Sequence, residues 1–321
     1  MSLSDLKRWL AEHIWVRPLG SVLLLASLLL LFPLRHLLAG FRQLDLRVVA
    51  AAVPLFLLVH LGGALKWHML VRRSGTPLSV VESIQCYYFG LFGNVFLPSV
   101  VGGDTFMVAL AVQKTEKRAG ILVASFLNRA LDLLALLLLA AGAVRLIPGS
   151  LTAPFRRTFN RTLAVAAVGV LLCAAAAAVA FRPSRSSGGL RRFLEKHSDA
   201  FQLLRSPKRI LAPLAFSILI QFCLIAVNVW VAAASGLHLP WAAWLFSWPL
   251  AKLASLLPVA AGGIGARELA LVALLTPFGA PAGQVVATGL AWEVIRALGG
   301  VAGGAIWKGI GWWARPAGGR G

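Results

Sequence analysis

Long runs of apolar residues, separated by short basic segments, make up most of the chain. A helix needs about 20 apolar residues to cross the ~30 Å hydrocarbon core of a bilayer. Six runs approach or exceed this length. We therefore predict an all-α polytopic membrane protein, in which residues 1–321 form a single integral membrane domain. The predicted spans are 19–39, 48–65, 119–144, 162–181, 210–235 and 284–307.

Two further apolar stretches, 78–114 and 240–280, are interrupted near their middle by proline and a pair of glycines. Proline removes an amide donor from a helix, and glycine permits backbone angles that a helix does not use. In hydrocarbon, the freed backbone groups are costly unless protein or water satisfies them. Each stretch is therefore expected to form a re-entrant hairpin or a pair of short crossing helices, beside a cavity or packed protein.

The interrupted stretches share a motif. Residues 97–103 read LPSVVGG and residues 257–263 read LPVAAGG, so the pattern LPxxxGG occurs twice. Each half of the chain has two spans, then the interrupted stretch, then one more span. Three net crossings per half give the halves opposite orientations, as in the inverted repeats of many transporters. We predict such a repeat, with halves 19–150 and 160–310; chance similarity between membrane segments is the alternative.

The composition fits this architecture and excludes several others. Hydrophobic residues make up 59% of the 321 residues and charged residues only 13%, whereas soluble domains are about 45–50% apolar and about 25% charged. The three cysteines lie far apart, so neither a disulfide framework nor a metal site is expected. These values exclude an ordinary soluble enzyme and a disordered protein.

The charge is strongly basic, with 31 Lys and Arg against 11 Asp and Glu. Because the basic residues lie between apolar runs, we expect them to face anionic lipid headgroups and not a nucleic acid. With the N-terminus inside, 20 of them fall in inner segments and seven in outer loops. The inner segments include 66–118, which begins with Lys66. The positive-inside rule then places both termini in the cytoplasm.

The inner loop 182–209 has apolar residues at helical spacing with basic residues between them. This pattern predicts a basic amphipathic helix on the cytoplasmic leaflet; a helix packed on the protein is the alternative.

Eight charged residues fall within or beside the predicted membrane segments. Arg129 and Asp132 are three apart on one span, and Glu293 and Arg296 are three apart on another, in the opposite order of sign. We therefore expect Arg129 to meet Glu293, and Asp132 to meet Arg296. The other four, near the breaks, are Asp104, Lys252, Arg267 and Glu268. A charge at mid-bilayer costs at least ~2.5–3.5 kcal/mol, so these residues line a polar pathway or form buried ion pairs.

Two composition features predict packing and anchoring. Gly299, Gly300, Gly303 and Gly304 form two overlapping GxxxG patterns on the last span, which favour close helix packing, with a dimer seam as the alternative. Tryptophans near the predicted span ends are expected to act as interfacial anchors. They are Trp67, Trp241, Trp244, Trp312 and Trp313.

The motif content excludes several mechanisms. The chain has no GxxxxGK[ST] loop, so no ATP motor is expected, and neither HExxH nor GxSxG occurs. We therefore expect no enzymatic activity and no cofactor.

Three blocks carry a family resemblance: NxxLPxxxGGD from Asn94 to Asp104, NRxxD from Asn128 to Asp132, and LP with GGIGARE from Leu257 to Glu268. In these the chain resembles the flippase-like transmembrane family, also called the lysylphosphatidylglycerol synthase transmembrane region. The chain departs from the pattern at Met107 and Asn128, where the family often has Arg and Glu.

The resemblance implies a bacterial inner-membrane protein that moves a lipid between leaflets without the soluble synthase domain of some relatives. The substrate would be an anionic phospholipid, a glycolipid, or a polyprenyl- or hopanoid-type lipid. Arg129, Arg267 and Arg296 would meet a phosphate or other anionic headgroup. The acids would hold these arginines, or bind a proton or a cationic headgroup, and the glycines would allow close backbone approach. The predicted substrate-binding residues are Asn94, Pro98, Gly102, Gly103, Asp104, Arg129, Asp132, Pro258, Gly262, Gly263, Gly265, Arg267, Glu268, Glu293 and Arg296.

Two other function classes stay open at this point. One is a membrane-embedded transferase on a lipid carrier, with Asp104 or Glu268 as the base. The other is an accessory scaffold for a lipid- or glycan-modifying synthase. The expected partners are membrane lipids and, in the last case, such a synthase.

Overall fold

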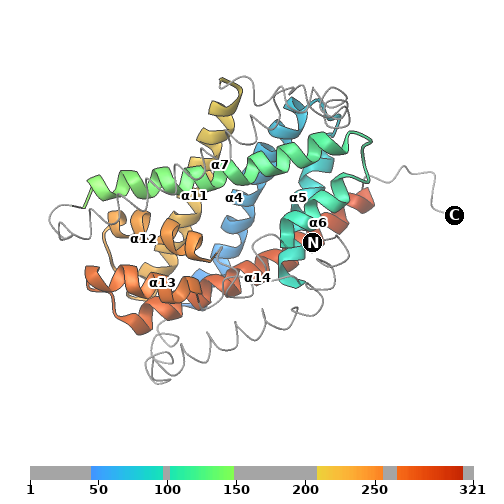
Figure 1. Ribbon diagram of the computed structural model, residues 1–321. Coiled ribbons are helices and arrows are strands. Elements are labelled where there is room, and N and C mark those ends of the chain that lie inside the picture. Colours follow the sequence, from blue (N-terminus) through green and yellow to red (C-terminus); the bar gives the residue numbers. More distant parts are fainter. Residues whose placement is uncertain (1–44, 97–101, 148–207, 256–265, 314–321) are drawn as a thin grey trace, which may run out of the picture.

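The computed structural model describes residues 45–96, 102–147, 208–255 and 266–313, and their regular elements are all helical (Figure 1). The helices are α4 (Leu46–Arg73), α5 (Val80–Phe96), α6 (Gly102–Ala111), α7 (Arg118–Arg145), α11 (Lys208–Ala234), α12 (Trp241–Ala254), α13 (Ala266–Leu275), the short 3-10 helix η2 (Thr276–Phe278) and α14 (Ala282–Trp313).

Four of these helices are long and apolar enough to cross a membrane: α4, α7, α11 and α14. They confirm the spans predicted at 48–65, 119–144, 210–235 and 284–307. The predicted spans 19–39 and 162–181 lie outside the described residues, as does the loop 182–209 except for its last two residues, which begin α11.

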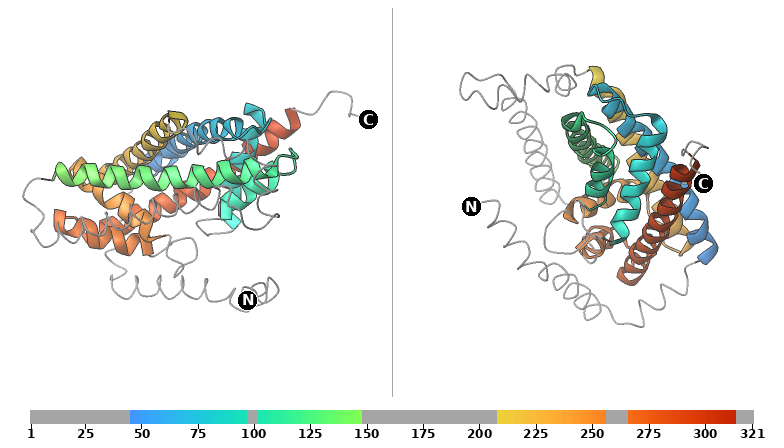
Figure 2. Two further views of the ribbon diagram at one scale, coloured as in Figure 1. Left: turned by 45° about the horizontal axis from the view of Figure 1, so that its top comes forward. Right: turned by 90° about the vertical axis from the view of Figure 1, so that its right-hand side faces the viewer.

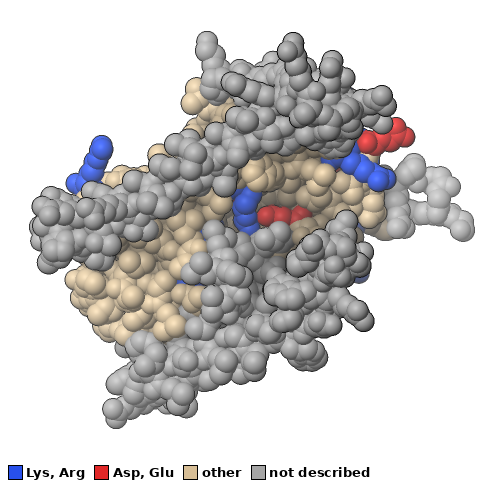
Figure 3. Space-filling view, in the orientation of Figure 1, with Lys and Arg blue, Asp and Glu red and all other residues tan. Residues whose placement is uncertain are grey.

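The long helices present large apolar side chains outward. The exposed residues include Leu58 on α4, Phe126 on α7, Leu219 on α11 and Val301 on α14, each more than half exposed. Charged side chains occupy little of the described surface in Figure 3, where most of that surface is tan. This surface suits a lipid environment, in which apolar exposure is not penalised.

Each interrupted stretch forms two short helices, α5 with α6 and α12 with α13, and the helices of each pair contact each other. The breaks themselves, residues 97–101 and 256–265, lie outside the described residues. A ten-residue helix such as α6 or α13 rises about 15 Å, which is half the ~30 Å hydrocarbon thickness. This length favours a re-entrant hairpin over two complete crossings.

A side-chain cap starts the first hairpin. The Ser79 hydroxyl accepts from the Glu82 amide at 3.2 Å, and the Glu82 carboxylate accepts from the Ser79 amide at 3.0 Å. This reciprocal pair is a capping box, which satisfies donors that the first turn leaves free. It fixes the point where α5 begins.

The described helices follow the order long, short, short, long in each half, and the halves pack reciprocally. The hairpin helix α5 packs on α14, and α12 packs on α7, while α4 and α11 pack on each other. In Figures 1 and 2, α7 and α14 lie along opposite sides of the bundle. This arrangement is compatible with the predicted inverted repeat, which stays a prediction.

The glycines of α14 form a packing seam within the chain. A Cβ atom built on Gly299 would meet the Phe56 ring, and one on Gly304 would meet the Phe92 ring. Gly300 and Gly303 likewise face α5. The GxxxG pattern thus serves internal packing, as predicted, and the alternative of a dimer seam is not needed.

Candidate functional site

A cavity of about 210 Å³ lies inside the helix bundle, between the two halves of the chain. Its lining comes from the four long helices and from α5, α12 and α13. Near the centre of the face shown in Figure 3, basic and acidic atoms lie together in a hollow of the surface. The bundle therefore holds a partly open cavity that is lined by both charged and apolar side chains.

Charged side chains of mostly one sign line this cavity. Five are basic and one is acidic. Three further carboxylates, which are not part of the lining, form ion pairs with the arginines. The lining residues are Lys66, Arg129, Lys252, Arg267, Arg296 and Asp132, and the supporting acids are Asp104, Glu268 and Glu293.

The charges of the first half form two ion pairs. Lys66 Nζ donates to Asp132 Oδ1 at 2.5 Å and to Ser217 Oγ at 2.9 Å, with the Lys66 side chain only 1% exposed. Arg129 Nε lies 3.4 Å from Asp104 Oδ2. Two cations thus face two carboxylates, and this side of the cavity has no net charge.

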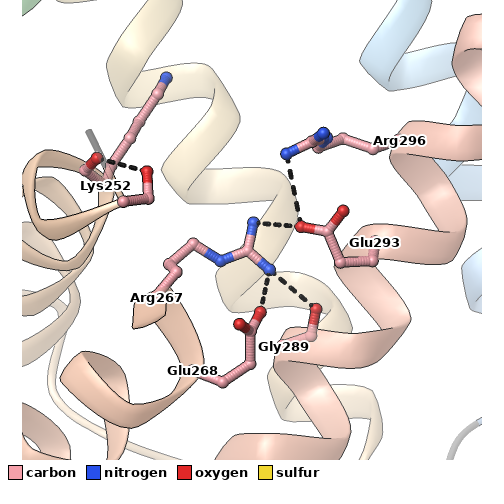
Figure 4. Close-up of polar contacts among 7 residues, drawn as sticks. Lys252, Arg267, Glu268, Gly289, Glu293 and Arg296 are labelled. Carbon is pink, nitrogen blue, oxygen red and sulfur yellow. Dashed lines mark hydrogen bonds and ion pairs between the residues drawn. The ribbon is translucent and has the colours of Figure 1, made fainter. Parts of the chain in front are cut away.

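The charges of the second half centre on Arg267 at the start of α13 (Figure 4). Its guanidinium donates to Glu268, to Glu293 at 2.8 Å and to the Gly289 carbonyl at 3.0 Å. Arg296 reaches the same Glu293 oxygen at 3.4 Å. Glu293 is therefore shared by two guanidinium groups from different helices.

Lys252 lies beside this cluster without joining it. Its amine donates to Gln221 Oε1 at 2.9 Å, and among the described residues no carboxylate lies within ion-pair distance of it. Figure 4 shows its side chain rising from α12 away from Glu268 and Glu293. Lys252 is thus a partly buried cation, and the partner of its amine among the described residues is the neutral amide of Gln221.

Aromatic side chains form another part of the cavity lining. Trp248 and Trp292 make an edge-to-face contact with centroids 5.2 Å apart, and the Arg267 guanidinium carbon lies 5.4 Å from the Trp248 ring centroid. On α4, His60 shares a hydrogen bond of 3.3 Å with the Tyr87 hydroxyl. The cavity therefore combines polar donors with large apolar faces, which is typical of small-molecule sites.

Tight contact between α5 and α6 supports the cavity from one side. Asn94 Oδ1 accepts from the Gly103 amide at 2.9 Å and so caps α6. A Cβ atom on Gly103 would lie 2.5 Å from the Gly90 carbonyl oxygen, a distance that real Cβ atoms do not show. Only glycine at position 103 allows the hairpin helices to approach this closely.

Replacing Gly103 by alanine is expected to destabilise the protein by about 1–3 kcal/mol, because the added methyl must push α5 and α6 apart. Unfolding in detergent, followed by circular dichroism, measures the change. The matched control is Gly142→Ala on α7, where a Cβ would meet nothing within 4 Å. Equal stability of the two variants would contradict the close approach.

The structure brings most of the predicted site residues that it describes to the cavity or to the arginines that line it. Asn94, Arg129, Asp132, Arg267 and Arg296 line the cavity. Asp104, Glu268 and Glu293 support the arginines, while Gly102 and Gly103 begin α6. The remaining predicted residues lie outside the described residues: Pro98, Pro258, Gly262, Gly263 and Gly265.

The partners of these charges differ from the expected ones. Arg129 and Asp132 do share the cavity with Arg296, but Asp132 pairs with Lys66 and Arg129 with Asp104. Glu293 pairs with Arg267 and Arg296. The expected pairs across the two spans are therefore not the ones formed, because α4 and α13 supply closer cations to the two carboxylates and α6 supplies Asp104 to Arg129.

Two other assignments from the sequence were wrong. Lys66 lies inside α4, which runs on to Arg73, and not in a cytoplasmic loop. Trp67 and Trp244 are fully buried, with the Trp67 indole donating to Ser125 at 3.0 Å. Trp241 and Trp312 are exposed, which fits the interfacial position predicted for them.

Sequence reasoning missed several cavity residues, among them His60, Tyr87, Gln221 and Trp248. Each is a polar or amphipathic residue inside an apolar run, and Trp248 is one helical turn before Lys252. That spacing was the available signal for Trp248. Among the described residues, no group of three His, Cys, Asp or Glu side chains is placed to hold a metal ion.

Comparison with known proteins gives one match. The family model described as "Lysylphosphatidylglycerol synthase TM region" matches residues 14–304, nearly the whole chain. No curated protein matches the chain, and no solved structure matches it.

Proposed function

The chain belongs to the lysylphosphatidylglycerol synthase transmembrane-region family, and we propose that it moves an anionic lipid between the leaflets of the bacterial inner membrane. The proposed orientation has both termini in the cytoplasm. Transport requires no ATP hydrolysis and no covalent step; an ion gradient or a lipid gradient drives it.

The observation that carries this proposal is the cavity. It is a chamber in an apolar bundle, and five of its six charged lining residues are basic. An anionic headgroup crossing hydrocarbon needs such a polar environment, because an unpaired charge there costs several kcal/mol. Its acyl chains remain in lipid beside the exposed apolar faces of the long helices.

The size of the cavity fits a headgroup. Sites for drug-sized ligands occupy about 300–1,000 Å³, and this cavity is smaller, at about 210 Å³. It therefore suits the polar end of a lipid and not the entire molecule.

Lipid exchange in reconstituted vesicles tests the proposal. Purified protein in vesicles with fluorescent phosphatidylglycerol should make the inner-leaflet label accessible to dithionite at least ten times faster than empty vesicles do. The assay is repeated with fluorescent glycolipids and with imposed proton and sodium gradients. Rates equal to those of empty vesicles for every lipid and gradient would reject translocation.

A further inference from the structure

Three buried polar side chains of the second half have unsatisfied hydrogen-bonding groups. They are the Asn228 amide on α11, the Trp244 indole N–H on α12 and the Thr288 hydroxyl on α14, and none of them has a partner in the described part of the chain. These residues are 0%, 1% and 2% exposed, and they are not among the residues that line the cavity. Because buried polar groups are nearly always hydrogen-bonded, these three require a ligand.

The three side chains belong to one packed region. Asn228 lies one turn after Leu224 on α11, and Thr288 lies one turn before Trp292 on α14, so each shares a helix face with that residue. Leu224, Trp292 and Trp244 itself are members of a single hydrophobic core cluster. Helix α11 packs on both α12 and α14. The unsatisfied groups therefore come from three helices that surround the same core.

The chemistry of these groups selects the ligand. The Asn228 amide both donates and accepts, as does the Thr288 hydroxyl, whereas the Trp244 indole only donates. An inorganic anion offers acceptors alone, and a metal cation offers no acceptor to the indole. Water donates and accepts, and a buried water typically makes two to four hydrogen bonds to polar groups. The near-complete burial of the three residues also favours a ligand as small as water.

Helix α12 connects this region to the cavity. Trp248 follows Trp244 by one turn and Lys252 follows by another, so all three share one helix face. Trp248 and Lys252 line the cavity, and the Trp248 indole N–H is likewise buried without a partner in the described residues. Trp248 also contacts Trp292, with ring centroids 5.2 Å apart, one turn from Thr288. Polar groups thus continue from the core to the cavity lining.

We infer that Asn228, Trp244 and Thr288 bind water, and that this water forms a hydrated branch of the cavity which begins at Trp248. The branch is a reservoir from which water solvates Lys252 when a headgroup leaves the cavity. In this role the inference rests on the proposed function. The water site itself depends only on the unsatisfied groups.

Radiolytic footprinting of the full-length protein in dodecylmaltoside micelles tests the water site. X-ray pulses generate hydroxyl radicals from bound water, and these oxidise the adjacent side chains. Trp67 is the internal control, because it is as buried as Trp244 but its indole donates to Ser125 at 3.0 Å. We expect Trp244 to be oxidised at least about fivefold faster than Trp67, since bound water lies next to it. Equal rates would overturn the inference.

Two substitutions remove groups that would hold the water. Thr288→Val keeps the shape of the side chain without its hydroxyl, and Asn228→Leu replaces the amide by an apolar group of similar size. Each should slow the oxidation of Trp244 by about threefold or more, because a buried water needs at least two polar partners. A rise in Trp67 oxidation would identify a variant that fails to fold, and the shape-matched Thr288→Val then decides.

The matched control is Ser235→Ala. Ser235 is also buried, but its hydroxyl already donates to the Val231 carbonyl at 2.8 Å. Its removal should leave the oxidation of Trp244 unchanged. Trp244 oxidation that is unaffected by Thr288→Val would contradict the assignment of this residue to the water site.

The vesicle assay separates the water branch from the transport function. Thr288→Val should slow lipid exchange about threefold if the branch resolvates the cavity; an unchanged rate would reject that role and keep the water site. Fast Trp244 oxidation in a protein that exchanges no lipid would support the site and reject the transport function. Equal oxidation of Trp244 and Trp67 in a protein that exchanges lipid would reject the branch alone.

Discussion

Replacing Lys66 by methionine is expected to lower the free energy of unfolding by about 3–5 kcal/mol. Its side chain is 1% exposed and its amine contacts Asp132 at 2.5 Å, so the substitution leaves the Asp132 carboxylate in the cavity wall without its cation. Asp132→Leu is expected to cost a similar amount, because it leaves Lys66 as the unpaired charge. Unfolding by heat or by dodecyl sulfate in mixed micelles measures both.

The double variant Lys66→Met with Asp132→Leu is the informative control. Replacing a buried ion pair by apolar residues of similar size is often close to neutral, so the double variant should recover to within about 1 kcal/mol of the parent protein. Lys308→Met, at an exposed position of α14, should have little effect. If the double variant is no more stable than either single one, the pair is not the source of the loss.

Arg267→Met should be nearly as damaging to stability and should abolish lipid exchange. The guanidinium binds Glu268, Glu293 and the Gly289 carbonyl together. Its loss leaves two buried carboxylates without their main cation, for which we expect a cost of about 3–5 kcal/mol. Dithionite accessibility in vesicles and unfolding in micelles report the two effects separately.

Arg267→Lys distinguishes charge from geometry at this position. A lysine amine is a point charge and cannot reproduce the planar donor array of arginine, so Glu293 should lose its fixed orientation towards the cavity. We expect the protein to fold while exchange slows about tenfold. Arg145→Lys, at the exposed end of α7, is the control and should exchange normally. Full exchange by Arg267→Lys would show that only the charge matters.

Hydropathy, together with the positions of proline and paired glycines, was enough to predict where the described helices lie in the sequence. Run length located α4, α7, α11 and α14, and proline with paired glycines located the two interrupted stretches, because bilayer thickness and backbone hydrogen bonding constrain both strongly. The concentration of intramembrane charges also predicted that Arg129, Asp132, Arg267 and Arg296 share one site.

The partners within the site could not be predicted in this way. Pairing depends on how each helix is rotated about its axis and on which neighbour is nearest, and hydropathy contains neither. Lys66 illustrates the difficulty, since a lysine after an apolar run usually marks the end of a span. Here Asp132 and Ser217 neutralise and solvate it, so α4 continues past it to Arg73.

The reciprocal packing of the hairpins has a consequence for biosynthesis. Helix α5 packs on α14, which is translated last among the described helices. After α5 has been translated, the face that contacts the glycines of α14 has no packing partner until α14 inserts into the membrane. A chain truncated before Ala282 should therefore be a substrate for quality-control proteases. The two halves should complement each other when they are coexpressed as separate polypeptides, but neither should accumulate alone.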